Sequence, residues 1–278
     1  MPRDFLAEMA KLSEERAAAA HEEREFEDVW DAALDAPAPL AIEHAGFDLI
    51  AEVKASSPSE GVLKSVTPEN AIEEAVLQAK LYEEAGAAAI SVLTEPTAFG
   101  GSLEHLRAVA AAVNVPVMRK DFLVADYQIV EAREAGASGV LLIVRMLSDD
   151  DLFEMIDLTR DMGMFCLVEA FDQADLDRLR RMLILRGGEF ATGDHLGELL
   201  VGVNCRDLAT LQVDSSRFEQ LRSSIPAGYA AVAESGIATP EDAAKVAKLG
   251  YTLALVGSSL MKSANPEQLA RQMLQAAR

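Results

Sequence analysis

The amino-acid sequence predicts an α/β fold, a (β/α)8 TIM barrel with an N-terminal helical extension. Eight short runs rich in Val, Ile and Leu alternate with amphipathic segments along the 278 residues. Runs that are apolar throughout are typical of parallel strands covered on both faces, and such a barrel needs about 250 residues. A doubly wound open sheet is the competing fold. Its Gly-rich dinucleotide turn is absent, because ASSPSEG follows Lys54.

Residues 1–46 precede the first apolar run and are predicted to form helices packed around or over the barrel, which 47–278 form. No Pro-, Gly- or Ser-rich linker divides the chain, so we expect a single domain overall. The expected strands are 47–55, 88–94, 115–121, 139–145, 165–170, 199–204, 229–236 and 253–259.

Start and stop signals bound several of the expected helices. A Ser or Thr N-cap, Pro at the first helical position and acidic residues in the first turn favour a helix start, and Gly favours its end. The last helix is predicted over 265–278. The other predicted helices run from Thr67-Pro68 to Gly86, from Ser148 to Gly163 and from Thr239-Pro240 to Gly250.

The charge balance is the unusual feature of the composition. The chain has 25 basic and 46 acidic residues, a formal net charge of −21. A negative field of this size repels nucleic acid and anionic membrane surfaces, which excludes both classes of partner. It also repels small anionic substrates unless the binding site reverses the charge locally.

Other features favour a cytoplasmic protein, a monomer or weak homo-oligomer, with no metal. No apolar run reaches the roughly 18–20 residues of a membrane span, and the acidic N-terminus lacks a signal-peptide pattern. Cys166 and Cys205 are far apart and form no CxxC pair, and Cys205 has no evident His partner. The histidines are not at metal-ligand spacing; they are His21, His44, His105 and His195.

Polar side chains gather at the carboxyl ends of the expected strands, where barrel enzymes build their active sites. Rim salt bridges are the alternative, although buried ionised groups are costly unless paired or used. Gly236 and the run 257–259 fit the phosphate site that barrels form after strands seven and eight, and tight turns that need Gly are the alternative. The remaining strand-end candidates are Glu52, Lys54, Lys120, Asp121, Glu169, Asn204, Arg206, Glu234 and Ser235.

The segment 184–198 joins a helix to the next expected strand. In a barrel it lies at the amino face, where loops usually concern stability. We expect a surface excursion, with an interface loop as the alternative.

Seven segments, in order from about residue 47 to residue 262, resemble the indole-3-glycerol phosphate synthase family. KDF with the following YQI, and the VN-x-RDL block, are the most specific. The segments are IAEVKASSPSEG (50–61), ISVLTEPTAFGGSLEHL (90–106), VMRKDFLVADYQIVEAREAGASGVLLIV (117–144), LVEAFD (167–172), VGVNCRDLATLQVD (201–214), AESGI (233–237) and LVGSSLM (255–261).

The resemblance implies a carboxy-lyase of tryptophan biosynthesis that uses no cofactor or metal. Its substrate would be 1-(2-carboxyphenylamino)-1-deoxyribulose 5-phosphate, which is cyclised, decarboxylated and dehydrated to indole-3-glycerol phosphate. Lys120 matches the family's general acid, whose pKa neighbouring groups would place near working pH. Glu169 matches the general base and would also stabilise positive charge on the anilino nitrogen. Glu52 and Lys54 match a second acid–base pair for dehydration, although Lys54 could also bind the substrate carboxylate or phosphate.

Other residues match positions that hold the substrate in this family. Asn204 would orient the substrate hydroxyls with support from Arg206. Phe99, Phe122 and Leu141 would hold the anthranilate ring, and core packing is the alternative for them. The expected substrate- or phosphate-binding positions are Ser57, Glu234, Ser235, Gly236, Gly257 and Ser258.

The chain departs from the family pattern near the expected cavity mouth. Ala55, Glu60 and Thr97 stand where the family commonly carries basic residues, and Ala170-Phe171 replaces the usual Val-His. We expect a thin positive pocket in a negative body, with the phosphate held mainly by backbone N–H groups. The lost basic residues also leave open a barrel of low activity that acts as a binding or assembly partner. Another phosphate-handling barrel enzyme, such as a sugar-phosphate isomerase, is the third alternative.

Overall fold

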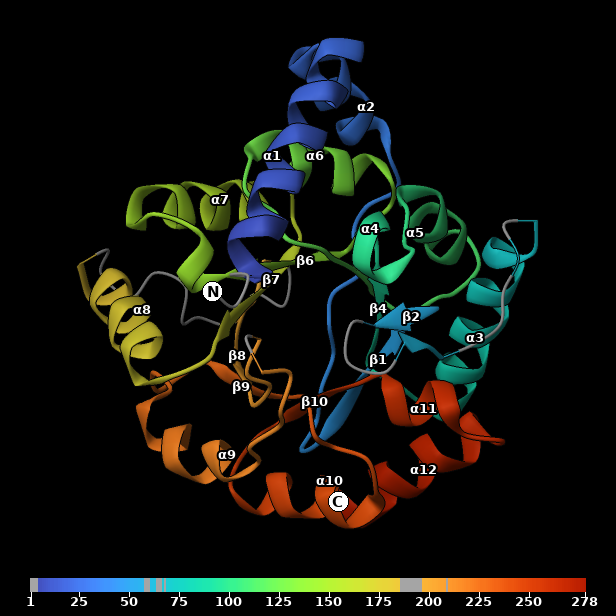
Figure 1. The fold of residues 1–278 in the computed structure, drawn as a ribbon, viewed down its shortest axis with the longest axis vertical. Coiled ribbons are helices and arrows are strands. Elements are labelled where there is room, and N and C mark those ends of the chain that lie inside the picture. Colours follow the sequence, from blue (N-terminus) through green and yellow to red (C-terminus); the bar gives the residue numbers. More distant parts are fainter. Residues whose placement is uncertain (1–4, 58–60, 64–66, 68, 186–196, 209) are drawn as a thin grey trace.

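A computed structural model describes residues 5–57, 61–63, 67, 69–185, 197–208 and 210–278. Eight parallel strands close into a barrel in the order β1-β10-β9-β8-β7-β6-β5-β4, which confirms the predicted (β/α)8 fold (Figure 1). Each barrel strand lies within a predicted run. The barrel strands are β1 (Asp48–Val53), β4 (Ala89–Leu93), β5 (Val117–Lys120), β6 (Gly139–Ile143), β7 (Phe165–Ala170), β8 (Leu199–Asn204), β9 (Ala230–Glu234) and β10 (Leu253–Val256).

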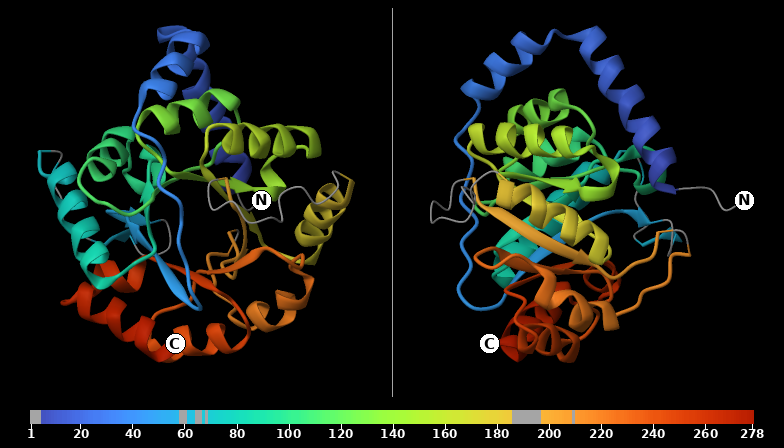
Figure 2. Two further views of the ribbon diagram at one scale, coloured as in Figure 1. Left: turned by 180° about the vertical axis from the view of Figure 1, so that it is seen from behind. Right: turned by 90° about the vertical axis from the view of Figure 1, so that its left-hand side faces the viewer.

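Helices surround the barrel on all sides (Figures 1 and 2). A two-stranded sheet of β2 (Ser56–Ser57) and β3 (Gly61–Val62) follows β1 and was not predicted. Within the described ranges, no helix combines the length and apolar character needed to cross a membrane. The helices are α3 (Ala71–Ala85), α4 (Pro96–Phe99), α5 (Leu103–Ala110), α6 (Asp126–Glu134), η1 (Val144–Met146), α7 (Asp149–Asp161), α8 (Gln173–Leu185), α9 (Ser216–Leu221), η2 (Arg222–Ser224), α10 (Pro240–Lys248), α11 (Ser258–Lys262) and α12 (Pro266–Ala277).

Most of the predicted helix ends are confirmed. The Ser148 hydroxyl caps α7, Thr239 forms a capping box at the start of α10, and α12 occupies the predicted C-terminal segment. The predicted start of α3 is wrong, because the helix begins at Ala71 with Asn70 as its N-cap residue. The Asn70 Oδ1 atom accepts a hydrogen bond from the Thr67 N–H, so these residues form a turn before the helix.

The N-terminal extension consists of α1 (Phe5–Glu23) and α2 (Phe26–Asp35), both packed against α6 (Figure 1). From α2 the chain runs to the amino end of the barrel and crosses it before entering β1 (Figure 2). Ile42 of this crossing segment is fully buried and belongs to the apolar cluster of the barrel interior. The extension therefore contacts both ends of the barrel, and the division at residue 46 stays a prediction.

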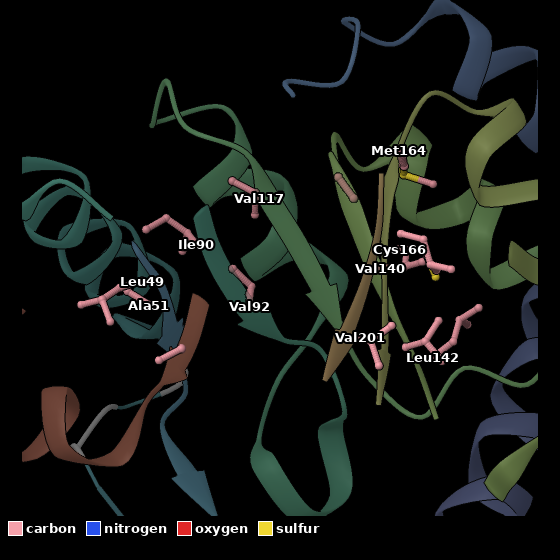
Figure 3. Packing of buried hydrophobic residues seen from close by; sticks show 14 of the residues in the cluster. Leu49, Ala51, Ile90, Val92, Val117, Val140, Leu142, Met164, Cys166 and Val201 are labelled. Atoms are coloured by element: carbon pink, nitrogen blue, oxygen red, sulfur yellow. The ribbon is translucent and has the colours of Figure 1, made fainter. Parts of the chain in front are cut away.

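Two apolar layers explain why the strands are mainly apolar below the rim, with Ser91 and Arg119 as buried polar exceptions. One layer fills the space between strands and helices and includes Leu49, Ile90 and Val92 (Figure 3). The other fills the barrel interior and includes Ile50 and Met118. Successive side chains of a strand point to opposite faces, so a strand covered on both sides is mainly apolar below the rim.

An ion pair joins two segments at the amino end of the barrel. His44 Nε2 lies 3.2 Å from Glu198 Oε1, just before β8 begins. Most of the expected surface excursion, 186–196, lies outside the described residues, and so does His195. The hydrogen bond to Glu198 raises the pKa of His44 despite the opposing effect of burial. The protonated imidazolium is therefore favoured in the folded chain.

We expect this pair to make stability depend on pH. Because folding raises the pKa of His44 above its ordinary 6.5, the stabilisation is full below that pH and is lost as pH rises through the folded-state pKa. His44→Gln should lower the free energy of unfolding by about 1 kcal/mol at low pH and by less above neutrality. Urea denaturation at several pH values measures this. Glu198→Gln should remove the same pH dependence, and an equal loss at every pH would contradict the assignment.

Candidate active site

A cavity of about 470 Å³ opens at the carboxyl ends of the barrel strands. It brings together every residue that the sequence singles out for catalysis or substrate binding, although their roles stay predictions. Those lining residues are Glu52, Lys54, Ser57, Phe99, Lys120, Phe122, Leu141, Glu169, Asn204, Arg206, Glu234, Ser235, Gly236, Gly257 and Ser258.

Strand periodicity places the charged groups of the cavity. Residues two apart along a strand share a face, so each charged group continues a column of apolar residues that point into the barrel. The floor of the cavity is thus the apolar interior, and its charged side chains form the layer above. The pairs of apolar and charged residues are Ile50 and Glu52, Met118 and Lys120, Leu167 and Glu169, and Val232 and Glu234.

Lys120 stands at the centre of this charged layer. Its Nζ atom lies 3.5 Å from Glu169 Oε2 and 3.9 Å from Glu234 Oε2. Asn204 Nδ2 donates a hydrogen bond of 3.1 Å to Glu169 Oε1, which orients that carboxylate. The arrangement places one amine against two carboxyl groups that are almost fully buried.

The pKa of Lys120 follows from this crowding. Burial of the ammonium lowers its pKa, but attraction from Glu169, Glu234 and Glu52 together outweighs burial and raises the pKa above its ordinary value. The expectation that neighbours bring this pKa toward working pH is therefore wrong for the free protein. Lys120 begins as a charged ammonium, the form that can donate a proton.

Lys54 and Glu52 form a second pair beside the first. Lys54 Nζ lies 2.5 Å from Glu52 Oε1, and only 12% of the lysine and 3% of the glutamate side chain are exposed. Gly257, which follows β10, leaves the space that the Glu52 carboxyl occupies, because a Cβ atom there would overlap Oε1. A small residue at this position is thus required by Glu52 as well as by any ligand.

The loops after β9 and β10 form the end of the cavity predicted to bind phosphate. Ser235 and Gly236 have φ values of 67° and 78°, so the chain turns sharply where it leaves β9. The Ser259 hydroxyl donates to the Ile237 carbonyl at 3.2 Å, which ties the two loops together. Lys262 also lines the cavity, and it was not predicted from the sequence. Its spacing of four residues from Ser258, which puts both on one helix face, is the signal that could have revealed it.

An aromatic wall forms another side of the cavity. The ring centroids of Phe99 and Phe122 are 6.1 Å apart, and Phe5 meets Phe122 edge-on at 5.8 Å. Phe5 comes from the N-terminal extension, and no sequence signal relates it to the barrel. Glu95 holds the turn that carries Phe99, since its carboxylate accepts hydrogen bonds from the backbone N–H groups of residues 97–99. Leu141 lines the cavity and also belongs to the interior core, so both interpretations of this residue apply.

Asp121, next to Lys120 in the chain, connects the N-terminal helix α1 to the barrel. Arg16 of α1 lies 2.7 Å from its Oδ1 atom, and Arg119 lies 3.4 Å from Oδ2. The Thr94 hydroxyl donates to Oδ2 at 2.7 Å, and the Phe122 N–H donates to Oδ1 at 2.8 Å. Burial alone would raise the pKa of Asp121, but the two guanidinium groups lower it below its ordinary value. Asp121 is thus a charged anchor for the extension.

The other residues that the sequence singles out lie outside the cluster of Lys120, Glu169 and Glu234. Arg206 donates its backbone N–H to Asn204 Oδ1 at 2.9 Å and a guanidinium N–H to the Leu211 carbonyl at 3.0 Å. Burial raises the pKa of the Cys205 thiol to about 12, which disfavours a nucleophilic thiolate. Phe171 is buried with the Arg145 guanidinium 4.5 Å above its ring, and Glu60 lies outside the described residues.

Acidic side chains line the cavity beside the expected basic ones, and the thin positive pocket stays a prediction. Among the described residues that line it, acidic and basic side chains are equal in number, because Asp121 and Glu234 accompany the expected pairs. No group of three or more His, Cys, Asp or Glu side chains in the described ranges has the arrangement of a metal site. The charged side chains are therefore arranged mainly to pair with one another.

Comparison with known proteins places this site in a family. The family model described as indole-3-glycerol phosphate synthase matches residues 6–273. The chain belongs to this family. An indole-3-glycerol phosphate synthase of Nocardioides sp. (strain ATCC BAA-499 / JS614) is 45% identical over 229 residues, 82% of this chain and 80% of the relative. The one from Aquifex aeolicus (strain VF5) is 40% identical over 273 residues, 98% of this chain and 92% of the relative.

Solved structures outside the family share its fold. The 3-hexulose-6-phosphate synthase of Salmonella typhimurium superimposes with a TM-score of 0.61 at 13% identity, covering 83% of this chain and 98% of that one. A structure described as native KDPGal gives a TM-score of 0.58 at 15% identity, covering 84% and 96%. At such low identity these two likenesses concern the barrel fold alone.

The anchor at Asp121 predicts that α1 stabilises the barrel through Arg16. Arg16→Met should lower the free energy of unfolding by about 1–3 kcal/mol, because Asp121 loses one partner in a buried site but keeps Arg119. Denaturant unfolding measures the change. Lys11→Met on the same helix is the matched control, since its ion pair with Glu15 is solvent-exposed and should contribute less than about 1 kcal/mol. Equal effects of the two substitutions would contradict the anchoring role.

Proposed function

We propose that this chain is an indole-3-glycerol phosphate synthase of tryptophan biosynthesis. It converts 1-(2-carboxyphenylamino)-1-deoxyribulose 5-phosphate to indole-3-glycerol phosphate, with loss of CO2 and water. Membership of the family supports the reaction, and the position of Lys120 between two buried carboxyl groups is the observation that carries the mechanism. A barrel that only binds partners gains nothing from burying such a cluster, which is costly to desolvate.

Ring closure is the step assigned to Lys120 and Glu169. The Lys120 ammonium donates a proton to the substrate carbonyl as the aromatic carbon attacks it. Glu169, oriented by the amide of Asn204, stabilises the positive charge that develops on the anilino nitrogen. The ring carbon that attacks carries the substrate carboxylate, so the bond to this carboxylate then breaks, CO2 leaves, and its electron pair restores the aromatic ring. The raised pKa of Lys120 keeps the donor charged before substrate binds.

Dehydration is assigned to the pair of Lys54 and Glu52. Their 2.5 Å separation lets a proton pass between them, so one can protonate the leaving hydroxyl while the other accepts a proton. Asn204 and Arg206 lie beside the cluster and are suited to orient the substrate hydroxyls. Glu234 fits contact with the uncharged parts of the substrate, because a carboxylate repels phosphate.

The two ends of the cavity suit the two ends of this substrate. The turns after β9 and β10, with Arg206 and Lys262 nearby, offer donors and positive charge to the phosphate. The wall of Phe5, Phe99 and Phe122 offers an apolar surface to the anthranilate ring. The cytoplasmic location and the monomeric or weakly oligomeric state stay part of this proposal.

A turnover assay separates the proposed function from its alternatives. Purified protein is incubated with the carboxyphenylamino-deoxyribulose phosphate, and indole fluorescence is followed. Formation of indole-3-glycerol phosphate supports the proposal. Absence of product at high protein concentration, with binding of the same substrate intact, would instead favour the binding or assembly role. Turnover of another sugar phosphate alone would favour a different barrel enzyme.

The assigned acid predicts the result of removing its charge. Lys120→Met should lower kcat by about 100-fold or more, since general acid catalysis contributes roughly 10²–10⁴. Steady-state kinetics with the same fluorescence readout measures the loss. Lys248→Met, at the far end of α10, makes the same change in net charge and should leave kcat unchanged. Near-normal turnover of Lys120→Met would overturn the mechanism.

The position of Lys262 predicts a separate effect on binding. Lys262→Met should raise KM by about 3-fold with kcat unchanged, because a partly exposed charge pair contributes roughly 0.2–1 kcal/mol. Salt screens such a contact, so KM of the variant should also rise less steeply with ionic strength. Lys248→Met again serves as the control. An unaltered KM and salt dependence would remove Lys262 from the phosphate end.

A further inference from the structure

The Glu234 side chain is buried in the barrel with few polar partners. Only 1% of the residue is exposed, and its carboxyl lies 3.9 Å from Lys120 Nζ. Neither of its oxygens accepts a hydrogen bond from a donor in the described part of the chain. A buried carboxyl without such donors is costly, so something must hold it there.

Gly202 of β8 lies directly against this carboxyl. A Cβ atom at Gly202 would overlap Glu234 Oε1 and lie 3.2 Å from Glu234 Cδ and from Leu167 Cδ1. Gly202 is not among the residues with positive φ, so its backbone would accept any side chain. Glycine inside a strand is destabilising relative to alanine. The residue is therefore explained by the space it leaves and not by its backbone conformation.

The strand register places Gly202 between the strands of Glu169 and Glu234. Gly202 pairs with Glu169 on β7 and with Val232 on β9, and Glu234 follows Val232 on the same face. Glycine thus stands between the two strands that carry the carboxyls. Because position 202 of β8 has no side chain, the Glu234 carboxyl can extend over this strand toward Glu169 and Lys120.

Two carboxyls this close do not both ionise readily. Burial and the repulsion of Glu169 raise the pKa of Glu234 well above its ordinary value, while Lys120 opposes this and Glu52 adds further repulsion. Glu234 accordingly tends to keep its proton. Glu169, the assigned base, lies nearer to Lys120 Nζ than Glu234 does, at 3.5 Å against 3.9 Å.

We propose that Gly202 is a positioning residue that seats the Glu234 carboxyl beside Lys120, opposite Glu169. Through this seat it fixes how close the second carboxyl lies to Lys120 and Glu169. The kinetic part of this inference rests on the proposed function, whereas the steric part does not.

The kinetic test is Gly202→Ala. The added methyl should push Glu234 out of its seat and lower kcat by about 100-fold, as a displacement of about 1 Å in an active site can do. KM should change much less, and the pH dependence of kcat should shift, since Lys120 and Glu169 lose their neighbour. A folded variant with wild-type kcat and pH profile would overturn the proposal.

The control and the rescue separate positioning from general damage. Gly139→Ala also adds a methyl to a barrel strand, but it meets the Phe165 ring at the amino end of the barrel. It should lower the melting temperature without altering the pH profile. Glu234→Asp shortens the displaced side chain by one methylene, so Gly202→Ala with Glu234→Asp should recover part of the kcat lost in Gly202→Ala alone. No recovery would contradict the steric seat.

A readout without turnover keeps this inference distinct from the proposed function. If the wild-type protein makes no product, the proposed function fails, and the seat is still tested by thermal unfolding of the same variants. Glu234→Asp should then reduce the loss of melting temperature caused by Gly202→Ala, and it should do nothing for Gly139→Ala. The same comparison applies if Gly202→Ala does not fold, since the double variant should fold. Additive effects in both backgrounds would overturn the proposal.

Discussion

A buried ammonium surrounded by carboxyl groups is the constraint on which the rest of the site depends. Lys120 is held among Glu169, Glu234 and Glu52, and each charge would be costly alone because burial removes it from water. The cluster persists because separate strands hold its members at fixed distances over an apolar floor. The small residues around it follow from the same need. Gly257 leaves room for Glu52, and Gly202 leaves room for Glu234.

The same pairing of charges determines how a strongly negative protein can bind a negatively charged substrate. The chain carries a net charge of −21, yet acidic and basic residues are equal in number among the described residues that line the cavity. Lys54 and Lys120 are engaged by carboxylates inside the cavity, so they contribute little attraction at long range. Capture of a phosphorylated substrate then depends on short-range donors at the turns after β9 and β10, together with the rim cations Arg206 and Lys262.

The N-terminal extension is part of the site as well as of the scaffold. Arg16 reaches Asp121 over a separation of 105 residues, and Phe5 completes the aromatic wall. Asp121 follows Lys120 and precedes Phe122 of that wall. Its ion pair with Arg16 therefore holds the backbone that carries both of these residues. Ile42 and His44 fasten the other end of the barrel. Binding and stability are thereby coupled through helices that lie outside the (β/α)8 repeat.

The sequence by itself determined the barrel, its strands and the polar residues at the strand ends, because these depend on local periodicity and on the rule that parallel strands end at one face. Motifs such as KDF and VN-x-RDL identified the family for the same reason, since each is contiguous. Only the tertiary structure decided the contacts between elements that are far apart in the sequence. The contacts of Phe5 and Arg16, the pKa of Lys120 and the space at Gly202 depend on distances between strands far apart in the chain. No local pattern encodes such distances, because they arise only when the barrel closes.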